Sequence, residues 1–413
     1  MSINIKDRNI LRELARQVAE IAVLPVQKET IALWKDLNRL KPVRGMVMID
    51  QISWHEMDVD GELTQQTEDG FCRGFETQLR RTLYSWKHIR ADMVVQPFVN
   101  VYKAIHGAGF GVGVIEETAV SDPRNSVVGH RYIDQFKTED DIMKIQMPNI
   151  SYDEDATKQT EEKAHEIFDG ILDVRVQGAL PGFAPWDSIV MWHGTNNMIL
   201  DMLDRPSFMH KIISRLTDAY LSMLDQFEEK GLLGFDQDTI HCSGAFTDEL
   251  PAPGFNPQHP RAKDLWTSGM AQIFSTVSPA MHQEFEIDYA KRWFARFGLG
   301  YYGCCEPLDE KIDIIRNLPN VRKISMSPWV DVEKGAERIG RDFVFSRKPT
   351  PAFLAWDTWK PEAVEQDLRE TQEKCNHYGC PFEFILKDIS TVHYQPQRLW
   401  EWVDIAMRVV KGE

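Results

Sequence analysis

The feature that most constrains the fold is a regular alternation of β-type and helical segments over the second half of the chain. From residue 174 onward, short runs rich in β-branched and aromatic residues are separated by longer runs in which apolar residues recur every three or four positions. The β-type runs include IHCSG (240–244), GLGYYGCCEPL (298–308), VRKISM (321–326), DFVFSR (342–347) and FEFILKD (382–388). Such alternation is typical of parallel βα units. It predicts an α/β protein, and a chain of 413 residues is long enough for one elaborated (β/α)8 barrel, the TIM barrel.

The first half of the chain is less regular and predicts two additions to the barrel. Apolar residues at helical spacing predict an N-terminal helical extension over residues 1–40, followed by a strand at 43–49. Between residues 93 and 134, β-type runs broken by glycines predict a second strand and a β-hairpin-like excursion. No internal repeat or low-complexity linker divides the sequence, so we expect residues 1–413 to form a single domain.

The composition excludes several classes of function. A net charge of −16 argues against a nucleic-acid surface and against an anionic membrane surface, because both need concentrated Lys and Arg. No apolar run approaches the roughly 18–20 residues that span a bilayer. The N-terminus reads as a charged amphipathic helix rather than a signal peptide, and the six cysteines are sparse. We therefore expect reduced thiols and a cytoplasmic location.

Two segments resemble a known family. The run SPAMHQEFEIDYAKRWFARFGLGYYGCCEPL, from residue 278 onward, is similar to the segment of uroporphyrinogen decarboxylase relatives in which a Ser-Pro-capped helix leads into a strand. The C-terminal run FILKDISTVHYQPQRLWEWVDIAMRVV resembles the last strand, loop and helix of that superfamily. The resemblance is clear over residues 174–413 and loose over 1–173. It implies the TIM barrel, and for the corrinoid-linked methyltransferase branch it implies zinc and a corrinoid carried by a partner protein.

The departures from the family pattern narrow the expected reaction. True uroporphyrinogen decarboxylases open with an Arg-rich signature, whereas LKPVRGMVMIDQISWHEM holds only Arg44, so we do not expect porphyrinogen decarboxylation. The methyltransferases carry a His-x-Cys-Gly zinc motif where this chain has Tyr302-Gly303-Cys304-Cys305-Glu306. Their late Cys ligand would fall near residues 388–390, which contain no Cys. A zinc site would therefore be rebuilt from other residues.

The candidate metal ligands are Cys304, Cys305, His241 and Glu249. Thiolate and imidazole groups at predicted strand ends suit Zn²⁺. Because consecutive side chains on a strand point to opposite faces, we expect only one of the two cysteines to ligate. The alternatives are two small buried cysteines, a histidine satisfied in the core, and a glutamate in solvent.

The candidate catalytic residues are His241, Glu306, Asp388 and His393. The last two lie in the loop that takes the place of the family's late ligand, where either residue could bind metal or act as a general acid. The alternative is that Asp388 caps a turn and His393 lies on the surface.

The function predicted first is a zinc-dependent methyltransferase that passes a methyl group from a small substrate to a corrinoid partner protein. An oxygen-rich zinc shell would favour an oxygen-linked methyl group, for example on an aromatic ring stacked against tryptophans at the barrel mouth. A cofactor-independent decarboxylase of a non-porphyrin substrate is the alternative, with Arg44, Arg175 and Arg347 as its candidate cationic groups. A non-catalytic ligand-binding barrel is the third hypothesis. The oligomeric state stays open, with a homodimer as one alternative.

Overall fold

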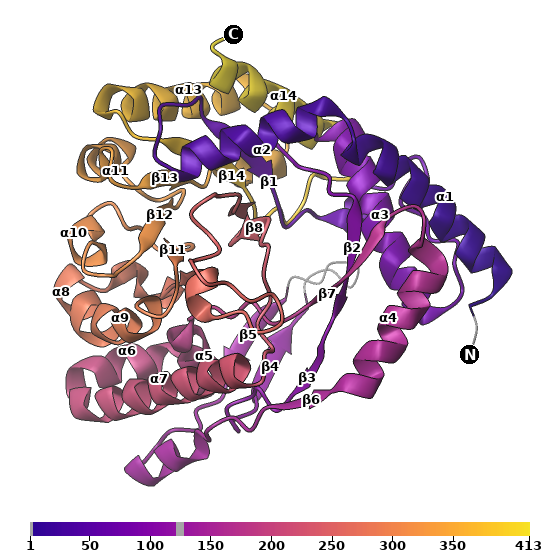
Figure 1. Ribbon diagram of the computed structural model, residues 1–413. Coiled ribbons are helices and arrows are strands. Elements are labelled where there is room, and N and C mark those ends of the chain that lie inside the picture. The colour runs from indigo at the N-terminus through magenta and orange to yellow at the C-terminus, as the bar shows by residue number, and fades with distance from the viewer. Residues whose placement is uncertain (1–2, 121–127) are drawn as a thin grey trace.

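The centre of the molecule is a six-stranded parallel sheet (Figure 1). The computed structural model describes residues 3–120 and 128–413. Within them the sheet has the order β1-β14-β13-β12-β11-β10, and every neighbouring pair is parallel. The strands are β1 (Met46–Ile49), β10 (Trp266–Gly269), β11 (Leu299–Tyr302), β12 (Val321–Met326), β13 (Val344–Arg347) and β14 (Phe382–Leu386). The predicted alternation of strands and helices is thus confirmed for this part of the chain.

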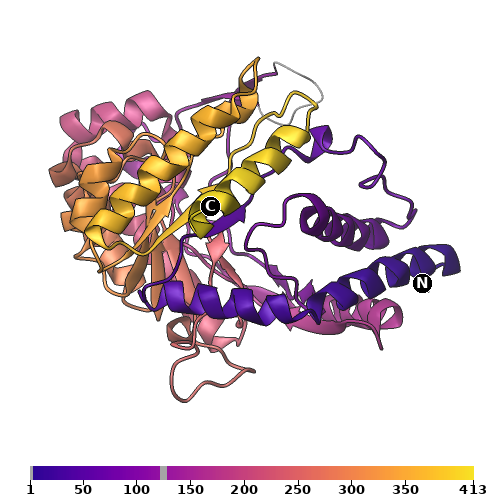
Figure 2. The same cartoon turned by 90° about the horizontal axis from the view of Figure 1, so that it is seen from above.

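Helices connect these strands and lie around the outside of the sheet (Figures 1 and 2). The connecting helices are α5 (Pro185–His193), α6 (Thr195–Asp204), α7 (Pro206–Glu229), α8 (Pro279–His282), α9 (Asp288–Phe294), α10 (Ile312–Ile315), α11 (Val332–Ile339), α12 (Ala352–Ala355), α13 (Pro361–Tyr378) and α14 (Gln397–Lys411). The long helix predicted over 279–297 is interrupted by a π-helical turn, Gln283–Ile287, between α8 and α9.

A second parallel ladder pairs β2 (Phe98–Tyr102) with β7 (Asp173–Gln177). It is flanked by α3 (Gly70–His88) and α4 (Glu154–Phe168). Isolated parallel bridges, Ala179 to Leu233 and Phe183 to Gly269, continue from β7 toward β10. The fold is therefore mixed α/β with a parallel central sheet, and closure into an eight-stranded barrel stays a prediction.

The N-terminal part carries the additions expected from the sequence. Helices α1 (Ile5–Ala22) and α2 (Pro25–Asn38) follow one another along one side of the molecule (Figure 2). Two antiparallel pairs lie beyond β2 along the chain: β3 (Ala104–His106) with β6 (Ser151–Asp153), and β4 (Glu116–Ala119) with β5 (Gly129–Tyr132). The β4–β5 pair is the predicted hairpin-like excursion. No helix among the described residues combines the length and apolarity that crossing a bilayer requires.

The two faces of the central sheet differ in polarity. Side chains such as Ile324, Phe345 and Phe384 face the helices and belong to the main hydrophobic core. The alternate positions carry fully buried polar groups, among them Lys323, Ser325, Ser346 and Glu383. Because side chains alternate along a strand, this pattern gives the sheet one apolar face and one polar face. The polar face is where the candidate site lies.

Candidate active site

A two-stranded hairpin lies against the polar face of the sheet. It consists of β8 (Thr239–Ile240) and β9 (Ser243–Gly244), joined by His241 and Cys242. Near its base, the carbonyl of Ala245 accepts a hydrogen bond from the indole of Trp266, the first residue of β10. Near its tip, the His241 ring lies 5.0 Å from the ring of Tyr301, toward the carboxyl end of β11. The base of the hairpin therefore lies near the amino-terminal ends of the sheet strands. Its turn, His241 and Cys242, lies near their carboxyl-terminal ends.

The hairpin turn has an unusual backbone. His241 and Cys242 have φ angles of 43° and 68°, the left-handed pair that a type I′ turn requires. Glycine and asparagine normally occupy these positions, and left-handed φ in other residues is concentrated at functional sites. Four more non-glycine residues with left-handed φ follow the neighbouring strands β1 and β14: Gln51, Asp388, His393 and Tyr394. Backbone strain is thus gathered around the carboxyl ends of the sheet.

Cys304 lies two residues beyond the end of β11. The chain turns at Gly303, whose φ is 94° and where an added Cβ would lie 2.3 Å from Leu308. This turn ends the strand, so alternation no longer separates Cys304 from Cys305. Their sulfur atoms lie 3.5 Å apart. Alternation along the strand therefore does not place the two side chains on opposite faces, and the expectation that only one of them ligates a metal stays a prediction.

The surroundings of Cys304 favour a thiolate. The Lys387 ammonium, directly after β14, donates a hydrogen bond to its sulfur at 3.1 Å. The Cys305 thiol, His241 and Lys387 together lower the pKa of Cys304, against the effect of burial. Although burial lowers the pKa of Lys387, the charges of Cys304 and Asp388 outweigh it and raise that pKa. The two residues form a buried thiolate–ammonium pair, an arrangement typical of reactive cysteines.

Burial favours the neutral form of His241. Burial lowers its pKa, and the opposing effect of Cys304 is smaller. Its Nε2 atom is buried and has no hydrogen-bond partner among the described residues. Cys242 differs from Cys304, because burial and the nearby Asp50 raise its pKa to about 12. Of these two cysteines, Cys304 is the one whose surroundings favour the thiolate form.

A second lysine lies beside this pair. Lys348, directly after β13, donates hydrogen bonds to the hydroxyls of Tyr301 and Ser346. Deeper along the same face, Lys323 and Glu383 form a fully buried ion pair at 2.8 Å, and both contact Ser243 of the hairpin. Three neighbouring strands thus each contribute a lysine to the polar face.

The structure brings some of the predicted site residues together. Asp388 lies 3.8 Å from the sulfur of Cys305 and 3.4 Å from the Lys387 ammonium. With His241 and Cys304, these side chains form one cluster at the carboxyl ends of β11 and β14, where functional groups of parallel βα proteins collect.

The other three predicted residues make contacts of a different kind. Glu249 forms a bidentate ion pair with Arg322, at the amino-terminal end of β12, because the chain leaves the hairpin on that side of the sheet. Glu306 is fully buried and accepts hydrogen bonds from the amides of Cys304 and Ala271, which makes it a support for the turn. His393 is exposed and its ring contacts the carbonyl of Ala355.

The described side chains do not fit a zinc centre as they are placed. Zinc sites use three or four protein ligands, and no group of three or more His, Cys, Asp or Glu side chains within residues 3–120 and 128–413 is arranged to hold a metal ion. The positive charge beside the Cys304 thiolate is supplied by Lys387.

The arginines considered for a decarboxylase are engaged away from the cluster. Arg44 pairs with Asp92, Arg175 with Asp236, and Arg347 with Asp367. The cationic groups of the site are lysines, which the sequence interpretation missed. Their signal is a Lys within an otherwise apolar β-type run, as in VRKISM and FEFILKD.

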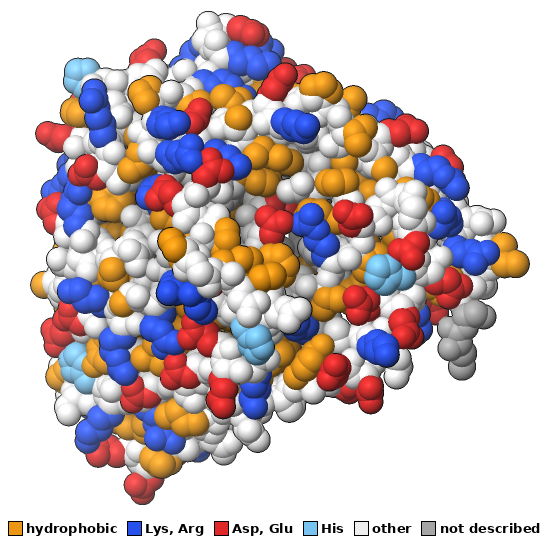
Figure 3. Space-filling model, in the orientation of Figure 1, with side chains coloured by type: hydrophobic (Ala, Val, Ile, Leu, Met, Phe, Trp, Pro, Cys, Tyr) orange, Lys and Arg blue, Asp and Glu red, His pale blue; other side chains and the backbone are white. Residues whose placement is uncertain are grey.

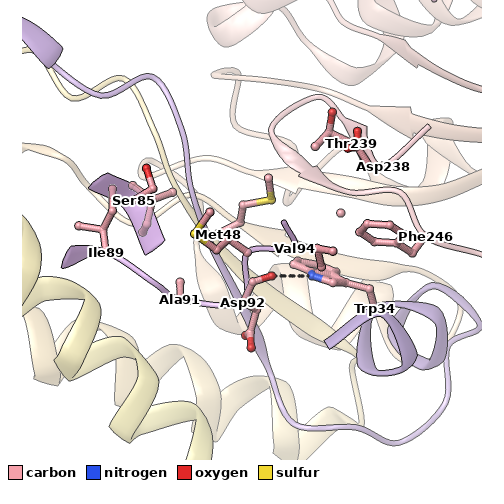
Figure 4. A pocket seen from close by; sticks show the side chains of 13 residues that line it. Trp34, Met48, Ser85, Ile89, Ala91, Asp92, Val94, Asp238, Thr239 and Phe246 are labelled. Atoms are coloured by element: carbon pink, nitrogen blue, oxygen red, sulfur yellow. Dashed lines mark hydrogen bonds between the residues drawn. The ribbon is translucent and has the colours of Figure 1, made fainter. Parts of the chain in front are cut away.

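A separate cavity of about 180 Å³ lies at the base of the hairpin (Figure 4). Asp238 and Thr239 border it on one side, and Trp34 and Phe246 on another. The Trp34 indole is fixed by a 2.9 Å hydrogen bond to the carbonyl of Asp92. None of the cluster residues around Cys304 lines this cavity.

No family model and no curated protein matches this chain. Among solved structures, the chain is similar to a methyltransferase from Methanosarcina mazei, with 11% sequence identity and a TM-score of 0.49. The match covers 92% of this chain and 97% of that one. Similarity at this level establishes neither a family nor a reaction.

Proposed function

We propose that this chain is a methyltransferase in which the Cys304 thiolate accepts a methyl group from a small methylated substrate and passes it to a corrinoid carried by a partner protein. The observation that carries the proposal is the 3.1 Å contact between the Lys387 ammonium and the Cys304 sulfur at the carboxyl ends of the sheet. A thiolate held by a buried ammonium is a strong nucleophile toward carbon. The sequence resemblance implies that the transferred group is methyl. It also implies the (β/α)8 barrel, in which the two parallel ladders would share one ring.

The charges of the cluster suit attack on an oxygen-linked methyl group. When the Cys304 sulfur takes the methyl, the bond between methyl carbon and oxygen breaks and the leaving oxygen becomes negative. The methylated sulfur is neutral, so the Lys387 ammonium loses its partner and can stabilise that oxygen instead. Charge stabilisation by a group already in place requires little reorganisation. Asp388, 52% exposed beside Lys387, borders the open side of the cluster.

The proposal assigns to Lys387 the positive charge that zinc was expected to supply. Elemental analysis of the wild-type protein and of Cys304→Ser tests this assignment. We expect less than one zinc per chain in both proteins. Stoichiometric zinc in the wild type that is lost in Cys304→Ser would contradict the role of Lys387.

An anaerobic assay with reduced corrinoid tests the reaction. We expect methylcobalamin to form from a methoxyaromatic donor with the wild-type protein and not with Cys304→Ser, while Cys72→Ser, altered far from the cluster in a buried helix position, keeps the activity. Methylcobalamin that forms from methylated thiols or amines but not from the methoxyaromatic donor would contradict the preference for an oxygen-linked methyl group. Equal activity in Cys304→Ser would contradict the proposed nucleophile.

A decarboxylase is the second candidate, and one observation favours it. Lys348 and Lys387 place two buried ammonium groups beside one another at the carboxyl ends of β13 and β14, and cationic groups at this place are what a decarboxylase would need. Release of carbon dioxide from a carboxylated substrate, without methyl transfer from any donor, would support this candidate over the methyltransferase.

A further inference from the structure

Lys348 is a buried ammonium group whose hydrogen bonds go to neutral oxygens. Its side chain is 3% exposed, and its Nζ atom donates to the hydroxyls of Tyr301 and Ser346. Within residues 3–120 and 128–413, no carboxylate lies within ion-pair distance of this atom. An ammonium carries three N–H donors, so one remains for another acceptor.

The neighbouring charges are already matched. Lys323 is paired with Glu383 at 2.8 Å, and Lys387 with the Cys304 thiolate and Asp388. A buried charge without a partner is unfavourable, and such groups are found where a ligand supplies the missing charge. Among the residues that the structure describes, Lys348 is therefore a lysine of this face without a carboxylate or thiolate in direct contact.

We propose that Lys348 binds the carboxylate of a small organic acid and so orients that substrate against Cys304. Under the proposed function, on which this inference rests, the substrate is a methoxylated carboxylic acid. Two ammonium groups would then balance two anions: Lys387 the thiolate, and Lys348 the substrate carboxylate. A monocarboxylate fits one lysine with one free N–H, whereas phosphate groups are usually held by several backbone amides or by arginine.

The location agrees with this role. Lys348 lies close enough to His241 for its charge to lower the pKa of that ring, and close enough to Cys304 for the thiolate charge to raise the pKa of Lys348. The ring of Tyr301, whose hydroxyl Lys348 contacts, lies 5.0 Å from the His241 ring in a tilted arrangement. A carboxylate bound to Lys348 would lie near the Cys304 thiolate. Two of the cluster residues, Cys305 and His241, are half-buried.

The charge of Lys348 depends on pH in a defined way. Burial lowers its pKa to about 8, Glu383 opposes the effect, and Lys387 adds to it. The groups that face it are Glu383 from β14, Lys387 directly after that strand, Cys242 from the hairpin, Tyr301 from β11, and Cys304 just beyond β11. The ammonium is thus mostly present at pH 7 and is lost above pH 8, so carboxylate binding should weaken over that range.

Calorimetric titration with 4-methoxybenzoate and its neutral amide, 4-methoxybenzamide, tests the inference without requiring turnover. We expect the wild-type protein to bind the acid at least about tenfold more tightly than the amide at pH 7, and to lose this preference by pH 9.5. Lys348→Gln should remove the preference, while Lys334→Gln, at an exposed lysine paired with Glu310, should keep it. The wild-type comparison decides the question if Lys348→Gln does not fold.

Equal wild-type affinity for acid and amide, or an unchanged preference in folded Lys348→Gln, would overturn the inference. Measuring both binding and turnover distinguishes a failure of the Lys348 site from a failure of the proposed methyltransferase function. Preferential acid binding without methyl transfer would leave the Lys348 site standing and contradict the methyltransferase. Methyl transfer at equal rates from the acid and from anisole would support the methyltransferase and contradict the Lys348 site.

Discussion

The Nζ atom of Lys387 lies 3.1 Å from the sulfur of Cys304, although 83 residues separate them in the chain. Lys387 follows β14 and Cys304 follows β11, so two strands, β12 and β13, lie between the strands that deliver them. The pair exists because parallel strands place their carboxyl ends at the same edge of the sheet.

Removing the ammonium should make Cys304 less reactive. In Lys387→Met, the loss of the positive charge raises the pKa of Cys304, so we expect alkylation by iodoacetamide at pH 6.5 to slow by more than about tenfold. Peptide mapping by mass spectrometry identifies the alkylated cysteine. Lys374→Met, which removes an ammonium from the α13 surface, serves as the control. An unchanged rate in Lys387→Met would show that Lys387 does not hold the thiolate.

The left-handed backbone at Cys242 predicts that glycine is more stable than alanine at this position, the reverse of the order inside a helix. Cys242→Gly should be more stable than Cys242→Ala by about 1 kcal/mol, because a Cβ is unfavourable at φ 68°. Urea denaturation of the two variants measures the difference. At Cys72, inside helix α3, the order should reverse, with alanine more stable than glycine. If the glycine and alanine variants had the same order of stability at Cys242 and at Cys72, the result would contradict a strained turn at Cys242.

The buried pair of Lys323 and Glu383 predicts strong coupling between the two residues. Lys323→Met leaves a buried carboxylate without its partner and should lower the free energy of unfolding by about 3–5 kcal/mol. The double variant Lys323→Met/Glu383→Met should recover most of that loss, because no unpaired charge remains. Additive losses in the double variant would show that the pair does not interact as the structure indicates.

His282 predicts a loss of stability in acid. Burial lowers its pKa to about 3, whereas the unfolded chain keeps a value near 6.5. The unfolded state therefore binds more protons below pH 6.5, so the stabilisation is complete above that pH and falls as the pH drops toward 3. In His282→Asn, the urea midpoint should change less between pH 7.5 and pH 5 than in the wild-type protein. An equal change of the urea midpoint in the wild-type protein and in His282→Asn would show that other groups cause the acid sensitivity.

The sequence predicted the parallel βα units because each strand and helix carries its own periodicity. It did not predict the hairpin of β8 and β9 on the polar face, since strands of two residues are too short to show alternation. IHCSG was expected to be a barrel strand for the same reason. Lys323, Lys348 and Lys387 were missed because a lysine in an apolar run does not show which face it occupies until the strand order is known.

The face of the molecule shown in Figure 3 carries side chains of both charge signs. Lys and Arg side chains alternate with Asp and Glu over the face shown in Figure 3, and no single sign dominates it. This face therefore lacks the concentrated Lys and Arg side chains that a polyanionic partner would need.

The state of Cys304 during the reaction tests the central claim most directly. The wild-type protein is incubated anaerobically with 4-methoxybenzoate carrying a trideuterated methyl group, without corrinoid, and its peptides are measured by mass spectrometry. We predict a trideuterated methyl group on Cys304 that disappears when reduced corrinoid is added. A labelled methyl group on another residue, or an unlabelled Cys304 in a preparation that still forms methylcobalamin, would contradict the account.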